Sequence, residues 1–203
     1  MITTVGRDAQ EPTRDRLLRE GLRLFATRGF AGTTVGEIEA AAGLTPRRGA
    51  LYNHFSSKEA LLDAAVDRYN ESASEAIAEF AAVQIGDPRA LAGLFGRWML
   101  ARLDEQREII QVLEHDGTRL VRLRDEFRKG TEAGFTAAAT VIRQWLAEQA
   151  IDADAETISV ILLGGLINFR RSTWTLGGAP LALDDDRFLT GFADLFEILV
   201  SAS

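Results

Sequence analysis

Apolar residues recur at three- and four-residue spacings along almost the whole chain, and this periodicity is the feature that most limits its fold. The first clear stripe contains Leu17, Leu18, Gly21, Leu22 and Phe25, which share one face of a helix with about 3.6 residues per turn. No run of β-branched residues alternates with polar residues between hairpin turns, as exposed strands would require. The sequence therefore predicts an all-α fold.

Glycine, proline and capping residues divide the periodic stretches into about nine helices. Gly29 and Gly43 follow the first two helices in the position where glycine commonly ends a helix. Pro46 can occupy the first position of a third helix that begins at Thr45. The expected helices cover about residues 14–28, 35–43, 45 onward, 57–83, 90–103, 107–114, 118–149, 154–176 and 184–200.

Composition excludes several kinds of site. The chain has 203 residues and no cysteine, so it has neither disulfides nor thiolate metal ligands. Its longest apolar run, 158–169, is too short to span a bilayer. The first residues lack the apolar stretch of a secretory signal. We expect a cytoplasmic protein with no cofactor and no metal.

Positive charge gathers in one short stretch of an acidic chain. The formal net charge is −7, yet "GLTPRRGALYNHFSSKEALL" (43–62) contains Arg47, Arg48, His54 and Lys58 with no acid between positions 39 and 59. Residues 1–70 carry a net charge of +1, and residues 71–203 carry −8. Such an asymmetry indicates different partners for the two parts, and a negatively charged partner for the first.

Two short helices that meet at Gly43 are typical of a helix-turn-helix. Ile38, Leu44 and Leu51 can hold the two helices together, which leaves the polar residues of the second helix outside. Arginine can donate two hydrogen bonds to guanine, and asparagine can bind adenine in the same way. The candidates for the major groove are Arg47, Arg48, Gly49 and Asn53.

The first seventy residues resemble the DNA-binding domain of the TetR family of bacterial transcriptional regulators. The matching residues are "GLRLFATRGFAGTTVGEIEAAAGLT" and "GALYNHFSSKEALL". The resemblance implies a homeodomain-like three-helix head and a helical body that binds an effector and dimerises. We therefore expect a flexible tail at 1–12, a helix-turn-helix domain at 13–60 and an effector-binding and dimerisation domain at 61–203.

The resemblance also implies phosphate contacts. The segment between Gly43 and Tyr52 is about two residues longer than is common in the family. These roles therefore transfer to Tyr52, His54 and Lys58, which follow it, and to the two threonines at expected helix starts, but not to Arg47 and Arg48. Local capping explains two of the threonines equally well, Tyr52 can be a core residue and His54 an ordinary surface residue. The expected phosphate contacts are Thr34, Thr45, Tyr52, His54 and Lys58.

The last two helices carry apolar stripes that either complete the core of one chain or pair with a second copy. A palindromic operator requires a symmetric dimer, and the resemblance favours a four-helix interface. The expected interface residues are Ile161, Gly165, Phe188, Phe192, Leu195, Phe196 and Leu199.

The middle of the chain is rich in large apolar residues, most of which we expect in the core. By the family resemblance, a cavity for a small-molecule effector lies among them, with few polar groups. The expected pocket residues are Trp98, Met99, Leu103, Gln111, His115, Phe135, Asn168 and Trp174.

Two other classes of protein compete with a regulator. An enzyme is disfavoured because neither histidine follows a glutamate by three positions, as a di-iron bundle would need, and the H-E-x-x-H, P-loop and G-x-S-x-G motifs are absent. A helical protein-binding adaptor without DNA binding remains the alternative, although the basic stretch argues against it. The sequence thus predicts a ligand-responsive, homodimeric DNA-binding regulator, most simply a repressor.

Overall fold

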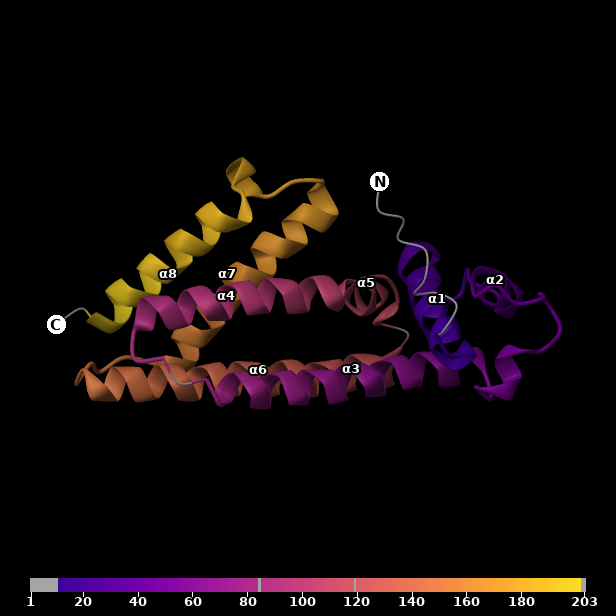
Figure 1. The fold of residues 1–203 in the computed structure, drawn as a ribbon, viewed down its shortest axis with the longest axis horizontal. Helices are drawn as coiled ribbons and strands as arrows, with labels where there is room; N and C mark the ends of the chain where they lie inside the picture. Colours follow the sequence, from indigo (N-terminus) through magenta and orange to yellow (C-terminus); the bar gives the residue numbers. More distant parts are fainter. Residues whose placement is uncertain (1–10, 84, 119, 202–203) are drawn as a thin grey trace. The chain divides into compact units, whose positions relative to one another are not determined.

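The computed structural model describes residues 11–201 except 84 and 119, and all regular structure in that part of the chain is helical. The prediction of an all-α fold is confirmed. Residues 1–10 of the predicted tail lie outside the described residues. The described residues form eight α-helices, which Figure 1 labels, and two short 3₁₀ helices: α1 (Thr13–Arg28), α2 (Val35–Ala41), η1 (Leu51–Asn53), α3 (Lys58–Ala81), α4 (Pro88–Glu105), α5 (Arg107–Asp116), α6 (Val121–Glu148), α7 (Ala155–Leu176), η2 (Pro180–Ala182) and α8 (Asp185–Ser201).

The helix ends follow local chemistry. Asp87 caps α4 by accepting hydrogen bonds from two backbone N–H groups, and Pro88 occupies the first turn, where its missing N–H costs nothing. Asp154 caps α7 in the same way, and the hydroxyl of Thr157, followed by its N–H, lowers the pKa of the Asp154 carboxyl group. Gly177 ends α7 in the left-handed conformation, with φ of 73°. The helix ends predicted from such residues lie within a few residues of the observed ends.

The prediction of a third α-helix from Thr45 is wrong. Residues 45–50 form turns, and only Leu51–Asn53 make a single 3₁₀ turn. Arg47 and Gly49 have φ of 63° and 72°, in the left-handed region that interrupts a right-handed helix. The N–H of Arg47 donates to the side chain of Glu39, 2.7 Å away, instead of to a helical carbonyl. The described residues therefore contain eight α-helices rather than about nine.

Among the described residues, the first of two compact units comprises those up to 71 together with 107–127. It contains α1, α2, η1, the first part of α3, α5 and the start of α6. Its core is centred on side chains that are fully buried: Leu17, Phe25, Ile38 and Leu51 from the N-terminal part, and Val112 from α5. Helix α5 packs on α1, so a segment that follows α4 in the chain completes the core of the N-terminal helices.

The second unit comprises residues 72–106 and 128–201 of the described chain, and α8 packs on α4 within it. Gly96 allows this close approach, because a Cβ there would lie 2.6 Å from the Cδ2 atom of Leu189. The rings of Phe169 and Phe188 stack with centroids 3.8 Å apart. Across the described residues, no helix combines the length and apolar character needed to cross a membrane.

Candidate nucleic-acid interface

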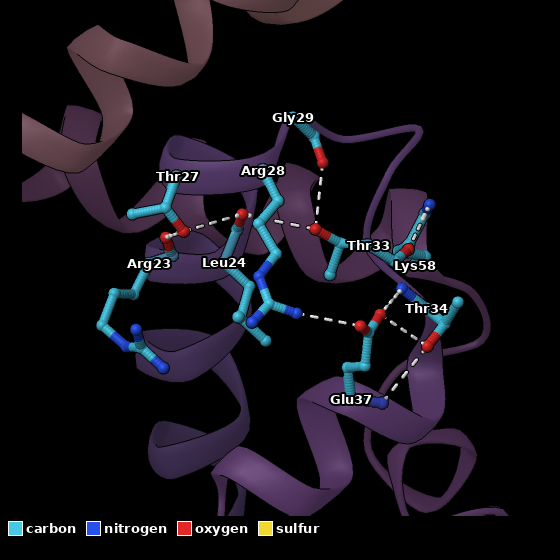
Figure 2. A network of polar contacts seen from close by, with 9 residues as sticks. All are labelled: Arg23, Leu24, Thr27, Arg28, Gly29, Thr33, Thr34, Glu37 and Lys58. Atoms are coloured by element: carbon cyan, nitrogen blue, oxygen red, sulfur yellow. Dashed lines mark hydrogen bonds and ion pairs between the residues drawn. The ribbon is translucent and has the colours of Figure 1, made fainter.

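Helix α2 begins with a capping box. The hydroxyl of Thr34 accepts a hydrogen bond from the N–H of Glu37 at 3.3 Å, and the Glu37 carboxylate accepts the N–H of Thr34 at 2.8 Å. Arg28, at the end of α1, forms an ion pair with Glu37 at 2.9 Å (Figure 2). Thr34 is exposed, but its N–H and its hydroxyl both donate to the Glu37 carboxylate at 2.8 Å, so the predicted phosphate contact would have to replace one of these bonds.

The capping box gives the head a pH-dependent contribution to stability. The N–H and hydroxyl of Thr34 lower the pKa of Glu37 below its ordinary value of 4.5, with a smaller contribution from Arg28. A carboxyl whose pKa is lower in the folded state stabilises the fold above its unfolded pKa, and this contribution is lost as the pH falls through the folded pKa. We expect Glu37→Gln to lower the thermal unfolding midpoint at pH 7, by an amount that shrinks below about pH 4.5. A difference that stays constant from pH 7 to pH 3 would contradict this assignment.

The turn between α1 and α2 is held together from two sides (Figure 2). The buried hydroxyl of Thr33 donates to the carbonyl of Gly29 at 2.9 Å. The ammonium of Lys58, at the start of α3, donates to the carbonyls of Phe30 and Thr33 at 2.6 and 2.9 Å. It also lies 4.2 Å from the centre of the Phe30 ring. Lys58 thus connects α3 to this turn, and one of its three N–H donors remains for the predicted phosphate contact.

Helix α5 contacts the same turn through the side chain of Asp116, its last residue. Its carboxylate is buried and accepts the N–H of Phe30 at 2.7 Å, although the two residues are 86 positions apart. Sequence analysis did not single out Asp116. Its neighbours, "HDGT", indicate only a helix end, and the partner is too distant in the chain to be paired by pattern.

The segment 45–54 carries most of the predicted DNA contacts on the surface. The ring of Tyr52 is 58% exposed, which is unusual for a large aromatic side chain and argues against the alternative of a core residue. Gly49 and Lys58 are half-buried. The predicted DNA contacts of the segment that are exposed are Thr45, Arg47, Arg48, Tyr52, Asn53 and His54.

The predicted pocket residues divide between the two units. Gln111 and His115 belong to the unit that contains the N-terminal helices, and the other six belong to the second unit. In the second unit, Trp98 contacts the rings of Phe80 and Phe95 at centroid distances of 5.2 and 5.7 Å. Leu103 is buried, whereas His115 and Asn168 are exposed; Met99, Gln111, Phe135 and Trp174 are half-buried.

The predicted interface residues occupy two faces of α7 and α8. Phe192 and Phe196 are buried in their own unit, and Phe188 and Leu199 are half-buried. Ile161 and Leu195 are exposed, and Cβ atoms built at Gly165 and Gly191 would meet nothing within 4 Å. Ile198, which the sequence analysis did not include, is 64% exposed. An apolar outer face therefore exists on both helices.

No group of three or more histidine, aspartate or glutamate side chains in the described part of the chain could hold a metal ion. The first unit presents a loop with Arg47 and Arg48, the exposed Tyr52 and the capped start of α2. Such groups bind phosphates and base edges.

The N-terminal part of the chain is similar in sequence to known regulatory proteins. Residues 17–65 match the family described as "Bacterial regulatory proteins, tetR family". The chain is 46% identical over 56 residues to the HTH-type transcriptional regulator YerO of Bacillus subtilis (strain 168), a match that covers 28% of this chain and 19% of that protein. It is 40% identical over 88 residues to the HTH-type transcriptional regulator AcrR of Shigella flexneri, covering 43% of this chain and 40% of that protein. The chain thus spans less than half the length of these curated relatives.

Solved structures resemble nearly the whole chain. A transcriptional regulator of the TerR/AcrR family from Aquifex aeolicus VF5 has a TM-score of 0.64 at 21% identity, covering 93% of this chain and 99% of that one. The structure of AibR in complex with isovaleryl coenzyme A and operator DNA has a TM-score of 0.69 at 20% identity, covering 92% and 99%. At these identities the likeness establishes the fold.

Proposed function

We propose that this chain, whose residues 17–65 match the tetR family of bacterial regulatory proteins, is a cytoplasmic, homodimeric repressor of that family that binds a palindromic operator and responds to a small molecule. The observation that carries the proposal is the exposed segment 45–54. In it, Arg47, Arg48 and Tyr52 project from a chain with net charge −7. An acidic protein approaches DNA only where its surface charge is locally reversed.

The second unit supplies the features that the other parts of the proposal need. Its aromatic cluster around Trp98 supports an apolar effector. The exposed apolar faces of α7 and α8 support a symmetric interface. AibR, which shares the fold, was solved with both an acyl coenzyme A and operator DNA, which favours the same pair of ligand classes here. A ligand that binds one conformation of the dimer better than the other shifts its affinity for DNA.

Selection of bound sequences from a random pool of duplex DNA tests the proposal. The expected result is an inverted repeat, because a two-fold symmetric dimer reads two equivalent half-sites. Affinity for the selected sequence should fall steeply as salt is raised. A protein-binding adaptor would enrich no sequence and show no such salt dependence.

Replacing Arg47 and Arg48 together by alanine should weaken binding to the selected operator more than binding to unrelated DNA. Each arginine that donates two hydrogen bonds to a base contributes about 1–3 kcal/mol of discrimination against the wrong base. The matched control is the double variant Arg128→Ala, Arg143→Ala, which removes the same charge from two exposed ion pairs of α6. An equal effect in both double variants would show that only net charge matters.

A further inference from the structure

The carboxylate of Glu39 is fully buried at the C-terminal end of α2. Its Oε2 atom accepts the N–H of Arg47 at 2.7 Å, and its Oε1 atom accepts the N–H of Leu51 at 3.0 Å. The backbone carbonyl of Glu39 accepts a third N–H, that of Leu44, at 2.8 Å. One residue of α2 thus binds the backbone before, within and after the loop 45–50.

These bonds explain how the loop keeps a conformation that the backbone alone disfavours. Arg47 lies in the left-handed region with φ of 63°, which costs free energy for any residue except glycine. A carboxylate that accepts two backbone N–H groups holds them more strongly than a neutral acceptor does. Because Leu51 is itself fully buried, its N–H has no water to replace this acceptor.

The stem of Arg47 is braced from a second side. A Cβ atom at Gly36 would lie 3.4 Å from the Cγ atom of Arg47, so the arginine stem runs close over α2 at a position without a side chain. Backbone and stem of Arg47 are therefore both fixed against α2, by Glu39 and Gly36 respectively. A side chain whose stem is already fixed loses less conformational entropy when it binds.

We infer that Glu39 is a positioning residue for DNA recognition: its buried carboxylate fixes a loop, in place of a recognition helix, from which Arg47 and Arg48 contact the bases. This inference rests on the proposed function, because it takes the loop as the element that faces DNA. Glu39 itself does not touch DNA. It acts on sequence preference rather than on overall electrostatic attraction.

The test is Glu39→Gln in the full-length protein, with Asp67→Asn as the matched control, since Asp67 is an exposed acid on α3 of the same unit. Glutamine presents one acceptor and one donor, so one of the two loop N–H groups loses its partner. Hydrogen exchange at the N–H groups of Arg47 and Leu51 should accelerate about tenfold or more, a loss comparable to one hydrogen bond to a charged group. Affinity for the selected operator should fall about tenfold to hundredfold for the same reason. Affinity for unrelated DNA, and the salt slope, should change less than about twofold.

The outcomes separate this inference from the proposed function. Accelerated exchange in a protein that selects no DNA sequence would support the bracing of the loop and refute the regulator. Sequence-specific binding by the wild type, with an unchanged ratio of operator to unrelated DNA in Glu39→Gln, would overturn the positioning role. If Glu39→Gln proves unfolded by circular dichroism, Glu39→Asp replaces it. The shorter aspartate keeps the charge but cannot reach both N–H groups, and wild-type exchange and specificity in that variant would equally overturn the inference.

Discussion

Replacing Leu195 and Ile198 by glutamate should convert the proposed dimer into monomers and lower operator affinity by about 10²- to 10⁴-fold, the advantage that two linked sites hold over one. The two side chains are 47% and 64% exposed on the outer face of α8. Glutamate there is therefore well solvated in a single chain. In a symmetric interface, however, the same carboxylates are buried without partners, at a cost of several kcal/mol each.

Sedimentation at micromolar protein concentration measures the first effect, and titration of operator DNA measures the second. The matched control is Leu181→Glu, since Leu181 is a leucine of η2 that is 91% exposed. This control should change neither the sedimentation nor the operator affinity. Phe192 and Phe196 are unsuitable for this test because they are buried in their own unit, and replacing them would damage the fold. A dimeric Leu195→Glu, Ile198→Glu variant would place the interface elsewhere.

Lys58→Met should destabilise the N-terminal unit by about 2–4 kcal/mol. Methionine keeps the apolar stem but removes the ammonium, and with it the hydrogen bonds to the carbonyls of Phe30 and Thr33 and the contact with the Phe30 ring. The expected decrease in the thermal midpoint is about 5–15 °C for a chain of this size. Because the effect acts on the fold, it should be measured without DNA.

The control is Lys129→Met, at the other lysine of the chain, which is exposed on α6. It should leave the midpoint almost unchanged. An unchanged midpoint in Lys58→Met, accompanied by weaker DNA binding, would mean that the ammonium serves chiefly as a phosphate ligand, as the sequence alone suggests. Loss of stability together with loss of binding would mean that it does both.

Lys58 illustrates why residue roles are harder to predict than helices. A lysine at the first position of a helix opposes the helix dipole, and this unfavourable placement suggests that the lysine binds an anion. In the structure, its ammonium turns to the carbonyls of the α1–α2 turn, about 25 residues earlier in the chain. A lysine at this position must find hydrogen-bond acceptors, and the sequence shows that much. The sequence pattern does not show that the acceptors are the carbonyls of Phe30 and Thr33.

Glu39 and Arg47 show the same limit for secondary structure. Pro46 after Thr45 favours the start of a helix by local rules. The buried carboxylate of Glu39 outweighs that preference by binding the N–H groups of Arg47 and Leu51. A helix prediction considers neighbours three and four positions apart, whereas these bonds join residues 8 and 12 positions apart.

The all-α fold, most helix boundaries, the capping residues and the basic segment of the N-terminal unit were all determined by the sequence itself. They depend on interactions within a turn or two of the chain, whose free energies are set by local residue types. Tertiary structure alone decided that residues 45–50 form a loop, that Lys58 binds the α1–α2 turn, and that Asp116 of α5 binds Phe30. In each case a buried or half-buried charged group binds backbone partners that are distant in the sequence, and such partners come within reach only after the chain has folded.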